Sequence, residues 1–202
     1  MKPLEAYSDL RRLGQPVFTT REAAAAWRSE QTTSSRRLRS LEQNGLIRRI
    51  RRGLWALDPE VDPQVVGPYL TAPLPSYVSL FSALARHGMI EQIPRQISLV
   101  STAASRRIPT ALGIFAVHQV APRLFGGFEG TEPSGYLAKP EKALFDLAYV
   151  RAAATSRAHL PELSLPAEFD RGELKRWTGR IDDKRLRTIV SRRLRELIEE
   201  AT

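Results

Sequence analysis

The segment that most constrains this chain runs from residue 19 to residue 58. It opens with consecutive alanines and one large apolar anchor, Trp27, which is typical of a short helix that leads into a polar turn. A second helix is expected next, with the hydroxyl of Thr32 or Thr33 as its N-cap, because such a hydroxyl accepts hydrogen bonds from the free N–H groups of the first turn. The helix should end at Asn44-Gly45, because glycine tolerates the left-handed conformation that is common at helix C-termini.

The predicted second helix has an inner face and a polar outer face. Leu38 and Leu41 share the inner face with Ser34, at helical spacing. Arg36 points almost opposite to that face. The other polar residues of the outer side and flank are Thr32, Thr33, Arg37, Arg39, Ser40 and Gln43. These side chains suit the major groove of DNA, because arginine can pair with guanine, glutamine with adenine, and serine or threonine with bases or phosphates.

Two short alternating runs follow this helix, at residues 46–50 and 54–57, and a turn at residues 51–53 joins them. A helix, a turn, a helix and a basic two-stranded ribbon occur in this order in a winged helix-turn-helix domain. The ribbon adds four arginines to the residues expected to contact DNA: Arg48, Arg49, Arg51 and Arg52. From residue 36 to residue 52 there are seven arginines and one acid, a net charge of +6, on the two elements that this fold presents to DNA. The alternative interpretation is a solvated basic face without a partner.

Charge is unevenly distributed along the 202 residues. Residues 1–60 carry a net charge of +5, residues 61–170 are neutral and residues 171–202 carry +4, for a total of +9. This length allows one large domain or two small ones. The lack of cysteine excludes disulfides and thiolate metal sites. Since the N-terminus has no signal-peptide pattern and no uncharged apolar run reaches the roughly 18 residues of a membrane span, the protein is expected to be soluble and cytoplasmic.

The predicted DNA-binding domain spans residues 1–60 and includes two further elements. A short strand at residues 16–19 is expected to pair with the wing. One more helix, which precedes the two described above, is predicted at residues 2–13. The evidence is an apolar stripe at three-residue spacing, formed by Leu4, Tyr7, Leu10 and Leu13.

The rest of the chain is expected to form a second domain. Residues 61–75 are interpreted as a Pro-rich connector, where the prolines argue against a long regular helix and allow a short one near residues 65–70. Residues 76–202 should form a small mixed α/β domain with a helical tail from residue 151, so the fold class is α/β (α+β). Helices are predicted at residues 76–87 and 140–149, from the cap Asp170 to residue 178, and after the cap Asp182; strands are predicted at residues 96–100, 114–120 and 134–138.

Together these features resemble the AbiEi-like antitoxins, a family of transcriptional regulators of type IV toxin–antitoxin systems. The similarity covers roughly residues 10–150 and includes the wing at residues 45–55. Its more specific part is a series of downstream motifs: Ile97-Ser98-Leu99-Val100-Ser101, Arg106-Arg107, His118, Leu124-Phe125-Gly126-Gly127 and the run from Ala138 to Asp146. The tail from residue 151 has no matching motif.

The resemblance implies an N-terminal DNA-binding domain and a C-terminal α/β domain. It also implies a dimer, or two molecules, on inverted repeats of double-stranded DNA in the protein's own promoter. The repressed two-gene operon would be of the abortive-infection type and serve phage defence. Its partner gene would encode a nucleotidyltransferase-like toxin, which antitoxins of this class oppose without a stable complex.

Enzymatic and metal chemistry has little support in the sequence. The three histidines, His87, His118 and His159, lie far apart, and there is no P-loop and no nucleophile elbow. Catalytic, cofactor and metal sites are therefore not expected. A Mg²⁺-dependent nuclease is the enzymatic alternative, since Glu173-Leu174-Lys175 and Asp182-Asp183-Lys184 match the acid-x-lysine pattern of restriction-type cores, although both fall in predicted helices.

Three alternatives concern the C-terminal half. The neutral middle of the chain could hold an effector, which would make the protein a ligand-responsive regulator. Residues 76–150 could also contact a toxin directly. The last helix is basic and amphipathic, and it either closes the C-terminal domain with a solvated face or adds contacts to phosphates or to a second copy.

Overall fold

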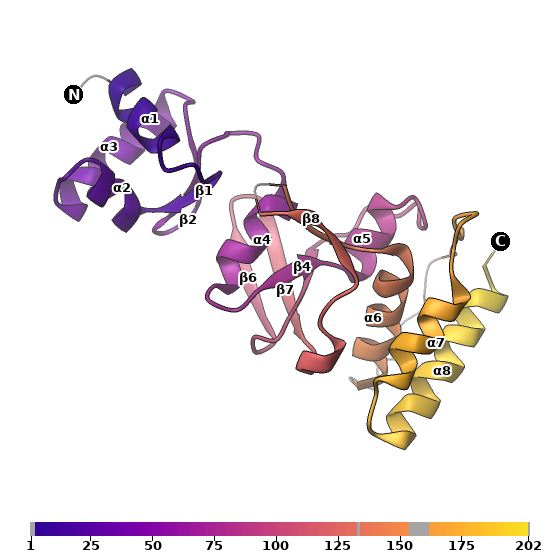
Figure 1. The fold of residues 1–202 in the computed structure, drawn as a ribbon. Coiled ribbons are helices and arrows are strands. Elements are labelled where there is room, and N and C mark those ends of the chain that lie inside the picture. Colours follow the sequence, from indigo (N-terminus) through magenta and orange to yellow (C-terminus); the bar gives the residue numbers. More distant parts are fainter. Residues whose placement is uncertain (1–2, 133, 154–161, 202) are drawn as a thin grey trace.

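The structure, a computed structural model, describes residues 3–132, 134–153 and 162–201. Figure 1 shows three parts in a row: a small N-terminal domain at one end, a larger sheet with its helices in the middle, and the last two helices at the other end. Helices and two separate sheets confirm the predicted α/β class. Within the described ranges, no helix is both long and apolar enough to cross a membrane.

The N-terminal domain has the element order of a winged helix-turn-helix. Its elements are α1 (Pro3–Arg11), β1 (Val17–Thr19), α2 (Thr20–Ala26), α3 (Gln31–Gln43), β2 (Arg48–Arg51) and β3 (Leu54–Ala56). The three strands form one antiparallel sheet in the order β1-β3-β2. The strand that precedes the two helices therefore pairs with the wing (β2 and β3), as predicted.

The two central helices begin in different ways, and the N-cap of α3 differs from the prediction. Helix α2 begins with a capping box, in which Thr19 Oγ1 accepts from the Glu22 N–H and the Glu22 carboxylate accepts from the Thr19 N–H. Helix α3 has Glu30 as its N-cap without a side-chain cap bond, so the prediction that Thr32 or Thr33 caps it is wrong. The chain becomes helical directly after Glu30, which places both threonines inside the first turn.

The core of this domain joins its three helices to the wing. In α1 the inward positions are Ala6 and Leu10, whereas Leu4 is 71% exposed, so the predicted apolar stripe is wrong at Leu4. Trp27 lies in the core, and its indole N–H donates to the carbonyl of Ala6 at 3.1 Å, which satisfies its polar edge. The buried residues of this cluster are Ala6, Leu10, Phe18, Ala23, Trp27, Leu38, Leu41, Ile47 and Trp55.

The second domain is built on a mixed six-stranded sheet. Its strands are β4 (Ser76–Val78), β5 (Ile97–Ser101), β6 (Arg106–Thr110), β7 (Gly113–Gln119), β8 (Phe128–Thr131) and β9 (Gly135–Ala138). They follow the order β6-β7-β5-β4-β9-β8, with parallel pairs β5–β7 and β4–β9. A short 3-10 helix, Pro122–Leu124, precedes β8. The three predicted strands are present, and β6, which carries Arg106 and Arg107, forms a hairpin with β7.

Two segments differ from the prediction. Residues 76–78 form a buried central strand, and helix α5 (Leu80–Arg86) begins only after it, so the prediction of one helix over residues 76–87 is wrong. Pairing of β4 with both β5 and β9 outweighs the local helical pattern. Helix α4 (Pro63–Thr71), longer than the predicted short helix, occupies most of the segment interpreted as a connector. Pro63 stands in its first turn, where a missing N–H costs least, and Asp62 caps it.

Three helices complete the C-terminal part. They are α6 (Pro140–Ala153), α7 (Arg171–Gly179) and α8 (Lys184–Glu199), and both α7 and α8 pack against α6. Asp170 caps α7 as predicted. The cap of α8 is Asp183, one residue after the predicted Asp182, whose carboxylate instead pairs with Arg123 at 2.7 Å. Residues 154–161, which include part of the loop predicted before α7, lie outside the described residues.

A single hydrophobic cluster connects the two domains. From the winged helix it takes Val17 and Ile50 with two residues of β3, and from the second domain it takes side chains of α4 and the sheet. The backbone N–H of Ala111, in the β6–β7 turn, also donates to the carbonyl of Ile50 at 2.9 Å. One side of the wing is therefore packed on the second domain, which leaves the other side for a partner.

Candidate nucleic-acid interface

Helix α3 presents the predicted polar residues outward. Ser34, Leu38 and Leu41 are its buried residues, as the helical spacing predicted. Arg36 lies on the opposite, exposed side. The other exposed members of the predicted set are Thr32, Arg39, Ser40 and Gln43, whereas Thr33 and Arg37 are half-buried.

Neighbouring contacts fix the orientation of α3. The hydroxyls of Ser29, in the turn, and Ser34, in the helix, are hydrogen-bonded at 2.8 Å. The guanidinium of Arg37 lies 5.8 Å from the centre of the Trp27 ring, a cation–π geometry. Arg37 therefore has a contact within the domain, while the guanidinium of Arg36 has no hydrogen-bond or ion-pair partner in the part of the chain that the structure describes.

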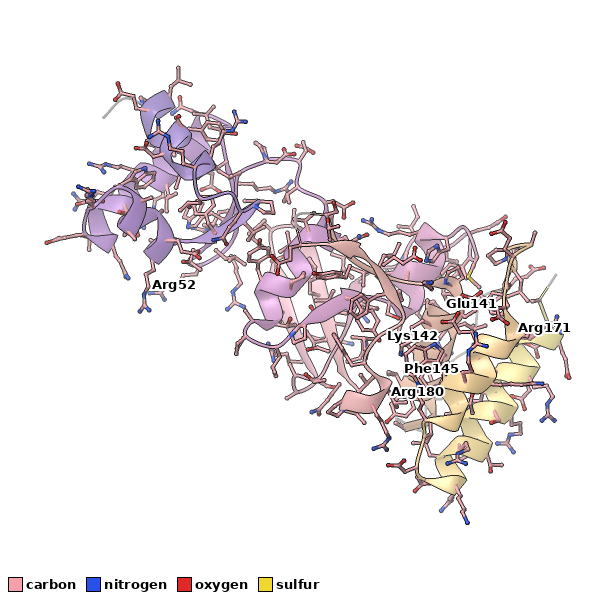
Figure 2. The ribbon with its side chains drawn as sticks, viewed as in Figure 1. Arg52, Glu141, Lys142, Phe145, Arg171 and Arg180 are labelled. Atoms are coloured by element: carbon pink, nitrogen blue, oxygen red, sulfur yellow. The ribbon has the colours of Figure 1, made fainter. Side chains whose placement is uncertain are left out.

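The wing is held at its tip by helix α2. The carbonyl of Gly53 accepts from the backbone N–H of Thr20 at 3.0 Å, and the Trp55 indole N–H donates to the hydroxyl of Thr20 at 3.0 Å. Gly53 has a φ of 81°, a left-handed conformation that favours glycine in this turn. Arg51 and Arg52 are exposed beside it, and Figure 2 shows Arg52 projecting from the domain into solvent.

A second link joins the wing to the end of helix α3. The backbone N–H of Arg49 donates to the carboxylate of Glu42 at 3.2 Å. Glu42, the one acid of the basic segment, is thus used to attach β2 to α3. The side chain of Arg49 remains exposed beside this link between α3 and the wing.

Arg48 lies apart from the other wing arginines. Its guanidinium donates to the carbonyls of Pro59 at 3.0 Å and Ala111 at 3.3 Å. Side chains alternate along a strand, so Arg48 shares a face with Ile50, which is buried against the second domain. That alternation is a signal in the sequence that could have separated Arg48 from Arg49.

The geometry therefore defines a winged helix-turn-helix domain that is attached to an α/β domain (Figure 1). Both its helix α3 and its wing are basic. Residues 5–57, which span this domain, match the family described as transcriptional regulator, AbiEi antitoxin. This confirms the predicted resemblance for that part of the chain and supports a transcriptional regulator of the antitoxin type. No curated protein matches the sequence. The similarity of residues 97–146 stays a prediction.

The other chemically suggestive residues have ordinary partners or lie apart. His87 Nε2 is 2.7 Å from the carbonyl of Ala138, and His159 lies outside the described residues. In the first nuclease-like tripeptide, Glu173 accepts from the Trp177 indole N–H within helix α7. The acids of the second, Asp182 and Asp183, pair with Arg123 and cap α8. Nowhere in the described ranges do three histidine or acidic side chains meet in a group that could hold a metal.

Sequence reasoning missed a buried polar cluster in the second domain. Lys142 and Asp146, one turn apart on α6, form an ion pair with both side chains fully buried. The second carboxylate oxygen of Asp146 accepts from the hydroxyls of Tyr77 at 3.0 Å and Ser79 at 2.8 Å. The Lys142 ammonium also lies 4.4 Å from the centre of the Trp177 ring (Figure 2 labels Lys142 beside α7). The cluster therefore joins α6 to the β4 segment and to α7.

Burial dominates the electrostatics of this cluster. It lowers the pKa of Lys142 and raises the pKa of Asp146, and the mutual attraction of the two charges opposes both shifts. Burial, and then the neighbouring Asp146 carboxylate, raise the pKa of the Tyr77 phenol far above its usual value. With no access to solvent, these groups serve to hold the fold, and the surface on α3 and the wing is the candidate functional site.

Proposed function

We propose that this protein is a sequence-specific DNA-binding repressor of its own operon and the antitoxin of a type IV toxin–antitoxin pair, acting in the cytoplasm. The observation that carries this proposal is the exposed arginine surface on α3 and the wing, in a domain whose sequence matches the AbiEi antitoxin regulators. In this proposal α3 enters the major groove. The wing arginines contact flanking phosphates or the minor groove.

The roles of the individual residues follow from where they lie. The exposed side chains of α3 read base edges or adjacent phosphates: Thr32, Arg36, Arg39, Ser40 and Gln43, with Thr33 and Arg37 on the flank. Arg49, Arg51 and Arg52 contact the DNA backbone. Arg48, whose guanidinium is directed to two carbonyls, positions the wing and does not contact DNA.

The proposed partners are DNA, a second copy and, functionally, a toxin. Two molecules bind inverted repeats in the operon's promoter, which a two-fold arrangement of winged helices would match. The neighbouring gene encodes a nucleotidyltransferase-like toxin, which the protein opposes without a stable complex.

The test is a titration of the full chain against its own upstream promoter and against a scrambled duplex, at two salt concentrations. A preference of about a thousandfold or more for the promoter, with a steep dependence on salt, is expected for a specific operator-binding protein. Equal affinity for both duplexes contradicts sequence-specific repression. In that case a Mg²⁺-dependent cleavage assay decides between a non-specific binder and a nuclease.

One cavity favours the ligand-responsive alternative. A cavity of about 480 Å³ lies between the two domains, where residues 14–16 of the winged helix face Tyr69, Tyr136 and the prolines after α4. A molecule bound there would touch both domains and could change how the wing is held. Release of promoter DNA by a small molecule that also raises the melting temperature of the full chain would support this alternative.

A further inference from the structure

A groove separates helices α7 and α8 at the end of the molecule far from the winged helix (Figure 1). It has a volume of about 510 Å³, and the described residues that line it all belong to these two helices. Its floor is apolar, formed by Leu174 of α7 and by Leu194 and Ile198 of α8. The lining residues of each helix recur at three- and four-residue spacing, so the groove follows the helix axes.

The rim of the groove is basic. Arg171 and Lys175 line it on the α7 side, and Arg187 and Arg195 on the α8 side, against one acid, Glu199. The guanidinium of Arg187 is bound to the carbonyl of Ile181, with donor–acceptor distances of 2.8 and 2.5 Å.

The other three rim cations are Arg171, Lys175 and Arg195. Among the residues that the structure describes, the side chains of Arg171, Lys175 and Arg195 have neither an ion-pair partner nor a hydrogen-bond partner. All three are exposed and line the groove together with Leu194. The groove thus combines an apolar floor with three available positive charges.

We propose that this groove binds an acidic amphipathic helix of a partner protein. A helix laid between α7 and α8 would place apolar side chains at i, i+3 and i+7 on the floor and its carboxylates against the basic rim. The lining stripe of α8 runs from Arg187 to Ile198, about 16 Å at 1.5 Å per residue, which matches roughly three turns of a bound helix.

The same observations disfavour two other occupants. A second copy bound through this groove in a two-fold dimer would bring two basic rims together. Duplex DNA would suit the rim but not the floor, because Leu174, Leu194 and Ile198 offer nothing to phosphates or base edges. The groove also lies at the opposite end of the molecule from α3 and the wing (Figure 1).

The test is fluorescence anisotropy of a labelled synthetic peptide with the full chain. The probe is a three- to four-turn helix with leucines on one face and glutamates on the other. Two control peptides replace every glutamate by lysine or every leucine by serine. We expect saturable binding of the acidic peptide only, and no competition from a random duplex DNA.

Matched variants locate the binding on the protein. Lys175→Glu/Arg195→Glu reverses two rim charges and should weaken peptide binding about tenfold. Arg185→Glu/Arg192→Glu makes the same change of net charge at two positions of α8 that do not line the groove, and should leave affinity within about twofold. All four side chains are exposed, so both variants should keep the circular dichroism spectrum and promoter affinity of the parent.

Three results would overturn the proposal. The first is no saturable binding of the acidic peptide up to about 1 mM, which is a binding free energy of only about −4 kcal/mol. The second is equal loss of binding in both double variants, which would indicate attraction to net charge alone. The third is displacement of the peptide by duplex DNA or by self-association of the chain, which would assign the groove to one of those occupants.

Discussion

Arg48 and Ala111 lie 63 residues apart in sequence, yet the guanidinium of Arg48 donates to the carbonyl of Ala111 at 3.3 Å. The N–H of the same Ala111 donates to the carbonyl of Ile50, two residues after Arg48, at 2.9 Å. The β6–β7 turn is therefore clamped on one face of the wing. This contact divides the wing arginines into one that supports the wing and three, Arg49, Arg51 and Arg52, that are exposed.

Arg48→Ala should lower stability while leaving the electrostatics of DNA binding almost unchanged. The variant loses hydrogen bonds from a charged donor to Pro59 and Ala111, a loss of about 1–3 kcal/mol in the free energy of unfolding. Urea denaturation measures this, and promoter titrations at several salt concentrations should give the parent's salt slope. A slope reduced by about one unit would show that Arg48 contacts a phosphate.

Arg51→Ala and Arg52→Ala should show the opposite pattern. Both side chains are exposed at the tip of the wing, so their removal should leave the unfolding free energy within about 0.5 kcal/mol. If each contacts one phosphate, each variant weakens all duplexes similarly and reduces the salt slope by about one unit. Binding of promoter and scrambled DNA at several salt concentrations checks this, and unchanged slopes in both variants would remove the wing tip from the interface.

Arg36→Ala should reduce discrimination between sequences. Arg36 is exposed opposite the buried face of α3, where a guanidinium can pair with a guanine, and the loss of such a pair costs about 1–3 kcal/mol. The ratio of promoter to scrambled affinity is the measurement. Arg95→Ala, which removes an exposed arginine from a loop of the second domain, is the matched control and should keep the parent ratio. Specificity that survives Arg36→Ala would show that another face of α3 reads the bases.

The parts of the fold that local pattern decides were predictable from the sequence. The inward spacing of Leu38 and Leu41 and the alternation along β2 are set by the geometry of a single element, and the structure has both. The alternation predicted for the second wing strand is wrong, because β3 is the central strand and is buried on both faces. Glycine in the turn between β2 and β3 likewise reflects a local backbone requirement.

The parts that depend on distant partners could not be predicted in the same way. Strand β4 reads as part of a helix, and only its position between β5 and β9 makes it a strand. Strand β8 was missed because Gly126-Gly127 dominates the local signal for a turn. Lys142 and Asp146 look like residues of a solvated face, and it is the enclosure of α6 by α7, α8 and the sheet that buries them.

His118 should make stability fall as pH decreases below neutrality. Burial, and then the nearby Arg107 charge, lower its pKa below the usual value near 6.5, so the unfolded chain binds a proton that the folded chain does not. The contribution of neutral His118 to the free energy of unfolding is therefore fully present above pH 6.5. It is lost as pH falls from there toward the lower pKa that His118 has in the folded state. In the parent, urea denaturation at about pH 7.5 and 5.5 should show the loss.

His118→Leu should remove this component of the pH dependence. The buried Nε2 of His118 has no hydrogen-bond partner in the described part of the chain, so at pH 7.5 the variant should be as stable as the parent or more stable by about 1 kcal/mol. An identical pH dependence in parent and variant would assign the titration to another group.

The buried pair in α6 gives the sharpest stability prediction. Lys142→Met leaves the Asp146 carboxylate buried without its cation and should cost about 3–5 kcal/mol of unfolding free energy.

In Lys142→Met/Asp146→Asn the side chain at 146 is neutral and its amide oxygen can still accept from Tyr77 and Ser79, so the double variant should recover much of that loss. Urea denaturation of the two variants and the parent measures the difference. The double variant should be the more stable of the two, because an uncompensated buried charge costs more than a neutral amide with its hydrogen bonds made. A double variant that is less stable than Lys142→Met would show that loss of Lys142 does not leave the Asp146 carboxylate uncompensated.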